Sequence, residues 1–224
     1  MENKVKDIKQ KIIKFDYEKS FSDKDYYVSN CNKGVFNLIH LWPKWEKNFL
    51  NIVGEKSSGK THLISMFLNK FNGIKYESNL FNYDHLNEIK IYQNIILENF
   101  TNNVDEKLLY SLINLIEQDN KYLIITSRRP LVENDFKLND LKSRSKNFLL
   151  QNINKPDDEL MFAIILKNFS DRQILIDKKL INHIIKRIDR SYGKIFDFIY
   201  KIDEISLKRK KPVDYKIINE VLGE

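Results

Sequence analysis

The chemistry that this sequence supports most clearly is the binding of a nucleotide phosphate. Eight residues match the P-loop pattern G-x-x-x-x-G-K-[ST]: Gly54, Glu55, Lys56, Ser57, Ser58, Gly59, Lys60 and Thr61. The glycines allow a tight turn whose backbone N–H groups surround a phosphate, and the following helix directs its positive end at the same point. The Lys60 ammonium then reaches the β- and γ-phosphates, and the Thr61 hydroxyl can ligate Mg²⁺. The pattern therefore predicts a site for ADP or ATP with Mg²⁺, whereas an ordinary Gly/Ser turn would not explain Lys60-Thr61.

An acidic residue at the end of a second strand belongs to the same chemistry. Glu98 follows the apolar run Ile95–Leu97, which is where P-loop proteins place the carboxylate that supports Mg²⁺. The alternative is that Glu98 is only a solvent-facing strand end. The next position, where a second acid would polarise the attacking water, is Asn99, and an amide cannot accept a proton. We therefore expect slow or absent ATP hydrolysis by the chain alone.

Further along the chain, polar and basic residues offer contacts to the terminal phosphate. Ser127 ends the next predicted strand and could reach the γ-phosphate, while Arg128 and Arg129 are either phosphate contacts or solvated loop residues. Arg144 precedes the last predicted strand. From there it could project towards a neighbour's nucleotide as an arginine finger and neutralise charge in the transition state. Spacing alone does not choose between this role and that of a surface residue.

These residues must be positioned by strands and helices that alternate along the chain. Apolar runs predict strands at Phe49–Val53, Ile74–Tyr76, Gln93–Leu97, Tyr122–Thr126 and Phe148–Leu150, and helices at Thr61–Phe71 and Val104–Gln118. Such alternation is typical of an α/β fold with a parallel sheet covered by helices on both faces. After Pro156 only helical patterns remain. We therefore expect an N-terminal arm at residues 1–20, a nucleotide-binding core at 21–154 and a small all-helical domain at 155–224.

The composition indicates a cytoplasmic protein with a sizeable core. Of 224 residues 42% are hydrophobic, yet no apolar run approaches the roughly 18 residues of a membrane-spanning helix, and no signal peptide is evident. A single cysteine, Cys31, excludes an intramolecular disulfide and a cysteine-rich zinc site. The formal net charge of +7 could indicate a nucleic-acid ligand. However, the lysines are spread among acids along the whole chain, which fits codon bias and a solvated surface better.

Several stretches, taken together, resemble the AAA+ module of the DnaA-type replication initiators. They are GEKSSGKTHL at 54–63, IILEN at 95–99, LIITSRRP at 123–130, LNDLKSR at 138–144 and the helical segment from residue 190. The last segment is similar to the lid of short DnaA homologues of the Hda type. The resemblance covers nearly the whole chain and implies a P-loop AAA+ core with a helical lid. It also implies that His62 and Lys194 contact the nucleotide.

The resemblance further implies a function in the negative regulation of replication initiation. Hda-like proteins carry a sliding-clamp-binding segment near the amino terminus, and residues 10–15 read QKIIKF, which has the form Q-x-x-[LI]-x-[FL]. Gln10 would enter a polar corner of the clamp pocket, while Ile13 and Phe15 would fill its apolar floor. Phe15 packing back on its own domain is the alternative. The clamp-bound protein would hold ADP or ATP and present Arg144 to ATP bound by DnaA, stimulating its hydrolysis.

The implied partners are therefore the DnaA initiator and the sliding clamp of DNA polymerase III. Assemblies of this chain through the nucleotide face are compatible with the resemblance, and no membrane is involved. The chain ends after the lid, without a helix-turn-helix domain, so we expect any DNA contact, for example at residues 208–211, to be weak.

The chain departs from the family pattern at several positions. Arg128 stands where the initiators have an acid, Gly193 stands where a sensor arginine of the lid is expected, and Glu98-Asn99 replaces two aspartates. These departures weaken self-catalysed turnover but leave the phosphate cradle complete. Two other functions stay open at this point: a DNA-localised accessory or loading factor of the DnaA/DnaC type, and a self-acting ATPase.

Overall fold

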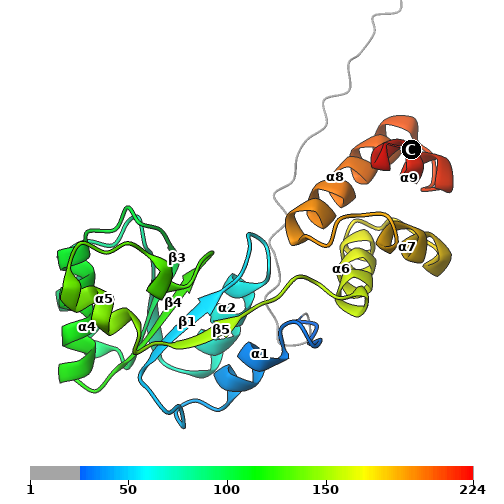
Figure 1. Ribbon diagram of the computed structural model, residues 1–224. Helices are drawn as coiled ribbons and strands as arrows, with labels where there is room; N and C mark the ends of the chain where they lie inside the picture. The colour runs from blue at the N-terminus through cyan, green and yellow to red at the C-terminus, as the bar shows by residue number, and fades with distance from the viewer. Residues whose placement is uncertain (1–25, 224) are drawn as a thin grey trace, which may run out of the picture.

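One parallel sheet forms the centre of the molecule. The computed structural model describes residues 26–223, so Gln10, Ile13 and Phe15 lie outside the described residues. The strands run in the order β2-β3-β4-β1-β5, and every neighbouring pair is parallel (Figure 1). Their bounds are β1 Phe49–Val53, β2 Gly73–Glu77, β3 Asn94–Phe100, β4 Tyr122–Ser127 and β5 Leu149–Asn152. The predicted α/β fold is thus confirmed, and the strand predicted at Ile74–Tyr76 is the edge strand β2.

Helices cover both faces of this sheet, as Figure 1 shows. One face is covered by α1 and α2, the other by α4 and α5, and the short helix α3 and two 3₁₀ turns lie in the connections. Their bounds are α1 Lys33–His40, α2 Lys60–Lys70, α3 His85–Glu88, η2 Ile89–Ile91, α4 Glu106–Gln118, η3 Leu131–Glu133 and α5 Asn139–Ser145. Helix α5 was not predicted, because Leu141 is the one apolar residue among its seven and gives no periodic signal.

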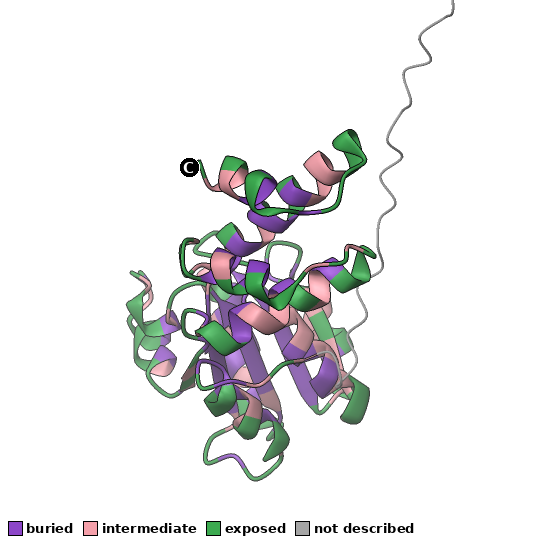
Figure 2. Ribbon diagram, turned by 90° about the vertical axis from the view of Figure 1, so that its right-hand side faces the viewer, coloured by how far each residue is buried: buried purple, intermediate pink, exposed green. Residues whose placement is uncertain are grey.

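The apolar core is divided by the sheet into two layers. Along β3, Ile95 and Leu97 pack on the α4 side, while Ile96 packs on the α2 side, as expected from the two-residue period of a strand. All five residues of β1 are buried, because β1 is a central strand with helices on both faces. Figure 2 shows the buried strands between helices whose outer faces are exposed.

After β5 the described chain is helical and forms a separate layer, here called the lid. Its helices are α6 Asp158–Asp171, α7 Lys178–Ile185, α8 Tyr192–Arg209 and α9 Tyr215–Leu222. They enclose an apolar cluster of their own, which includes Phe169, Ile184, Ile199 and Ile218. Aspartates cap three of these helices by accepting backbone N–H groups: Asp157, Asp177 and Asp214. The domain division at 154/155 stays a prediction. None of the described helices is both long enough and apolar enough to cross a membrane.

A buried lysine joins the segment before β3 to the beginning of β4. The Lys121 ammonium donates to the carbonyl oxygens of Ile89 and Tyr92, at 3.1 Å each, and also to that of Lys90. We expect Lys121→Met to lower the free energy of unfolding by roughly 2–3 kcal/mol, because buried carbonyls lose their donor. Denaturant titration checks this, with Lys107→Met on exposed α4 as the control. A loss within about 0.5 kcal/mol of the control would show that the contact is not stabilising.

Candidate nucleotide-binding site

The P-loop leaves β1 directly into a tight turn that only small residues allow. A Cβ on Gly54 would lie 2.5 Å from Ser58 Oγ and 3.2 Å from Ile153 Cβ, so a side chain there would clash. Gly59 has φ of 93°, a conformation that side chains disfavour, and it is the N-cap of α2. The turn therefore directs the first N–H groups of the eleven-residue helix α2 at the loop.

Lys60 folds back over the loop that it serves. Its ammonium donates to the carbonyl oxygens of Gly54 (2.7 Å) and Glu55 (2.8 Å). Burial lowers the pKa of Lys60 from 10.5 to about 8, and the positive charge of Arg128 contributes in the same direction. An anionic phosphate in the loop would favour the charged form of this lysine again. The site is thus electrostatically prepared for an anion.

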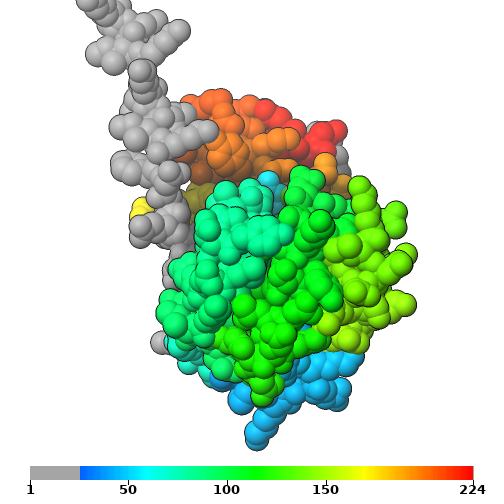
Figure 3. All heavy atoms as spheres, turned by 90° about the vertical axis from the view of Figure 1, so that its left-hand side faces the viewer, coloured from blue at the N-terminus to red at the C-terminus, as the bar shows by residue number. Residues whose placement is uncertain are grey.

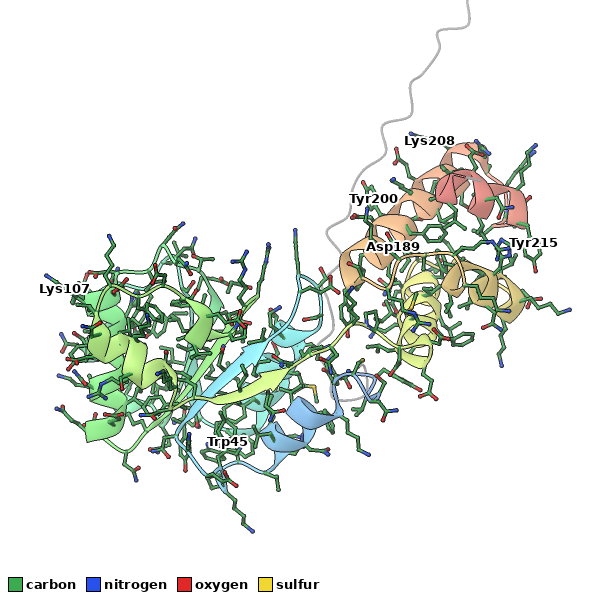
Figure 4. All side chains as sticks on the ribbon, in the orientation of Figure 1. Trp45, Lys107, Asp189, Tyr200, Lys208 and Tyr215 are labelled. Carbon is green, nitrogen blue, oxygen red and sulfur yellow. The ribbon has the colours of Figure 1, made fainter. Side chains whose placement is uncertain are left out.

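A cavity of about 1620 Å³ opens in front of the P-loop, between the sheet and the lid. The core contributes the loop itself and the segments after β3 and β4, and the lid contributes residues of α6 and α8. Tyr200, labelled in Figure 4, belongs to the lid side of this lining. The cavity lies at the carboxyl ends of the parallel strands, where α/β folds bind their ligands.

Most of the residues predicted to bind nucleotide surround this cavity. The lining includes Lys56, Ser57, Ser58, Gly59, Lys60, Thr61, His62 and Ser127. Gly54 and Glu55 do not line it but shape the loop beneath. Lys194 is exposed on α8 and does not line it. The assignment of these residues to a nucleotide stays a prediction.

Beside the P-loop, aromatic rings form a wall of the cavity that the sequence did not indicate. The ring of Tyr26 stacks on Phe36 with centroids 5.9 Å apart and meets the edge of His62 at 5.2 Å. Burial raises the pKa of Tyr26, so its hydroxyl stays neutral. A flat apolar surface of this kind suits the face of a planar base. His62 was expected here from resemblance alone, while Tyr26 comes from a polar stretch without periodicity.

The buried side chain of Asn51 positions the segment that follows β4. Its amide donates to Ile125 O and Ser127 Oγ, both at 3.0 Å, and its oxygen accepts the N–H of Leu131 at 2.9 Å. The Ser127 hydroxyl in turn donates to Arg129 O at 2.6 Å. Sequence reasoning missed Asn51. The available signal was a polar residue inside an otherwise apolar strand, since such a residue requires buried partners.

Glu98 and Asn99 lie in different environments although they are neighbours. Glu98 is 1% exposed and its Oε2 lies 3.1 Å from the ammonium of Lys75. Asn99 is exposed, lines the cavity and has a φ of 54°. Its backbone N–H donates to Thr126 Oγ1 at 3.0 Å, and its carboxamide donates to the carboxylate of Glu77. The position after Glu98, where a second acid would be needed for hydrolysis, therefore carries a neutral carboxamide in the cavity lining.

The donor set for Mg²⁺ fits only in part. Thr61 lines the cavity, whereas Glu98 is buried behind the lining and is already paired with Lys75. The assignment of Mg²⁺ to these two residues stays a prediction, and no step of the function below depends on it.

Glu55 ties the P-loop to the lid. Its carboxylate accepts the Ser191 hydroxyl at 2.8 Å and the backbone N–H of Tyr192 at 3.3 Å, so it caps the first turn of α8. A negative charge is favourable at a helix amino terminus. Tyr192 is 2% exposed and donates from its hydroxyl to Asn154 O at 3.1 Å. The P-loop and the first helix turn of the lid are therefore directly connected by hydrogen bonds.

Arg144 lies on a different side of the molecule from the cavity. Its guanidinium pairs with Glu117 of α4 and lies 5.3 Å from the centroid of the Tyr110 ring. The hydrogen bond with Glu117 raises the pKa of Arg144. Among the described residues that line the cavity, none comes from α4 or α5. Figure 3 views the molecule from the side of these two helices. Arg144 therefore cannot reach the nucleotide of its own P-loop without a rearrangement.

The sheet order, the P-loop sequence after β1 and the helical lid over the carboxyl ends define an α/β P-loop module with a helical lid. No family model matches the chain. It is 25% identical over 225 residues to the chromosomal replication initiator protein DnaA of Thermoanaerobacter sp. (strain X514), covering 89% of this chain and 51% of that protein. It is also 24% identical over 191 residues to an uncharacterised protein of Haemophilus influenzae, covering 78% and 81% of the two.

Solved structures support the same relationship at the level of the fold. Domain III of Thermotoga maritima DnaA superimposes with a TM-score of 0.72 at 19% identity, covering 91% of this chain and 95% of that one. A DnaA bound to AMPPCP and single-stranded DNA gives 0.66 at 17% identity, covering 84% and 67%. The chain is thus homologous, at low identity, to the AAA+ domain of DnaA. It spans about half the length of the first DnaA relative, so the activity of whole DnaA is not transferred by this match.

The position of Lys60 leads to a direct test of the cavity. We expect Lys60→Ala to weaken the binding of a fluorescent ADP analogue by about 100-fold or more, because the buried cation that faces the phosphates is removed. Lys107→Ala is the control, since Lys107 is exposed on α4 outside the cavity lining and should change affinity by less than about fivefold. Equal affinities for Lys60→Ala and the unaltered protein would place the nucleotide elsewhere.

Proposed function

We propose that the protein is a nucleotide-binding, DnaA-like AAA+ regulator of replication initiation that binds the sliding clamp and stimulates hydrolysis of DnaA-bound ATP. The observation that carries this proposal is the separation of its two charged centres. The P-loop cavity has its full phosphate cradle but an amide, Asn99, at the hydrolytic position. Arg144 lies outside that cavity, on the α4–α5 side. Such an arrangement suits a protein that holds a nucleotide and acts on one held by another.

The working ligand in this proposal is ADP or ATP at the P-loop. The cavity is larger than the 300–1,000 Å³ or so typical of small-molecule pockets, and its aromatic wall and Lys60 supply contacts for a base and for phosphates. A DnaA structure holds the ATP analogue AMPPCP, which supports an adenine nucleotide here. The bound nucleotide then has a structural task, because Glu55 joins the loop to α8 of the lid.

The clamp in this proposal is recognised by residues 10–15, whose sequence has the form of a clamp-binding peptide. Gln10 supplies a polar anchor, and Ile13 and Phe15 supply apolar ones, which is how an extended peptide obtains specificity. Clamp binding would bring the protein to replicating DNA in the nucleoid.

Direct DNA binding has little support from the charges of the lid. Lys208, labelled in Figure 4, pairs with Glu204 at 2.6 Å, and Arg209 pairs with Glu220 at 2.6 Å. Half of the basic run at 208–211 is therefore already neutralised. We accordingly propose weak, non-specific contact with DNA at most.

Arg144 provides the central mutational test. We expect Arg144→Ala to reduce stimulation of the DnaA ATPase by about 100-fold or more, since an arginine finger stabilises the charge of the transferring phosphoryl group in the transition state and is worth about 10³–10⁵ in kcat. Binding of ADP to the variant itself should be unchanged. Lys142→Ala is the matched control because it removes an exposed cation from the same helix. Stimulation by Arg144→Ala at the level of the control would rule out the finger role.

Clamp binding is tested separately, with Gln10→Ala combined with Phe15→Ala. We expect the double variant to lose at least about tenfold in affinity for the purified sliding clamp, because it removes both types of anchor. Lys9→Ala with Lys14→Ala serves as the control for general charge effects. The affinity is measured by surface plasmon resonance, with the full chain passed over the immobilised clamp. Unchanged affinity of the Gln10/Phe15 variant would disprove the assigned motif.

The two alternative functions give different results in the same assays. A DNA-localised accessory factor would bind single-stranded or duplex DNA tightly and with a steep salt dependence when no clamp is present. A self-acting ATPase would turn over ATP without DnaA, which would contradict the interpretation of Asn99.

A further inference from the structure

The carboxylate at the end of β3 already has a cation from the neighbouring strand. Lys75 of β2 is paired in register with Ile96 of β3, so its side chain lies on the same face of the sheet as Ile96. Glu98 is two residues beyond Ile96, and the ammonium of Lys75 reaches its Oε2 at 3.1 Å. This is the face covered by α2, whose first turn carries Lys60 and Thr61.

Glu98 has few other groups to interact with. It is 1% exposed, and its Oε1 has no hydrogen-bond partner among the described residues. The neighbouring amide of Asn99 does not contribute, because its donors are directed at Glu77 of β2. Lys75 is therefore the cation in direct contact with this buried carboxylate, while Lys60 interacts with it electrostatically without an ion pair among the described residues. The side chain of Lys75 is 38% exposed, so it approaches from the edge of the sheet.

The local charges matter for a divalent cation. Mg²⁺ in nucleotide sites is held by one or two carboxylates in addition to the phosphates. Here the charge of Glu98 is balanced by Lys75, the second position is the neutral Asn99, and the nearest cation to the phosphates is Lys60. A carboxylate that is already neutralised by an ammonium group offers a divalent cation much less electrostatic attraction than a free one.

We propose that Lys75 is a built-in counter-ion for Glu98, so that this carboxylate no longer carries the uncompensated charge that would hold Mg²⁺. The P-loop then holds ADP or ATP with little dependence on the divalent cation. This inference rests on the proposed binding of an adenine nucleotide and adds which cation accompanies it. Lys75 can reach Glu98 because it lies on β2, which is the neighbour of the strand β3 that carries Glu98.

The test is the affinity of the full chain for a fluorescent ADP analogue, measured in excess Mg²⁺ and in excess EDTA. We expect the two dissociation constants of the unaltered protein to differ by less than about fivefold. In Lys75→Met the uncompensated Glu98 should recruit Mg²⁺. The ratio of the dissociation constant in EDTA to that in Mg²⁺ should therefore become at least about fivefold larger than in the unaltered protein. Lys75→Arg retains a cation and should behave as the unaltered protein does, and Lys107→Met on α4 is the control for loss of an exposed charge.

Any other pair of ratios overturns the proposal. Two results would show that the pairing of Lys75 with Glu98 does not govern the Mg²⁺ dependence. One is a strong Mg²⁺ requirement in the unaltered protein, and the other is a ratio in Lys75→Met equal to that of the unaltered protein. If Lys75→Met does not fold, Lys75→Gln keeps a donor towards Glu98 without the charge and is judged by the same criterion. Failure to bind nucleotide under either condition would contradict the proposed function as well, whereas binding that requires Mg²⁺ would contradict only this inference.

Discussion

The parallel pairing of β1 with β4 on one side and β5 on the other positions the P-loop, the Ser127 segment and the start of the chain to the lid. Because parallel strands end at the same edge of a sheet, the P-loop after Val53, the Ser127 segment and the chain leading to the lid all begin side by side. Asn51 adds a sequence-distant restraint within that pairing, since it fixes both Ser127 and Leu131. A change in this register would move the phosphate cradle away from the residues that face it.

The lid is connected to this edge through side chains as well as through the chain itself. The carboxylate of Glu55 caps α8 directly, and the Tyr192 hydroxyl donates a hydrogen bond to the carbonyl oxygen of Asn154, just after β5. A ligand that reorganises the P-loop therefore acts on the first turn of α8 through contacts already present. In the proposed function, this connection would let a bound nucleotide influence the lid without being hydrolysed.

The fold and the phosphate cradle could be predicted from sequence because both depend on local patterns. Apolar runs specify β1, β3 and β4, and the P-loop spacing specifies the turn before α2. What the sequence did not indicate are side chains that act across the fold. Asn51, Lys75 and Tyr26 contact residues that are distant in the sequence, which lie on β4, β3 and α2 respectively. The same reason explains Lys194, which the resemblance placed at the nucleotide but which lies exposed outside the cavity.

The proposed function requires that one nucleotide is held between the P-loop and the lid. Hydrogen exchange of the full chain with and without saturating ADP tests it most directly, because it reports both segments in one experiment. The account predicts slower amide exchange at residues 54–62 and in the first turn of α8 together. If ADP binds and neither segment is protected, or if protection appears only in segments outside the cavity, the account is wrong.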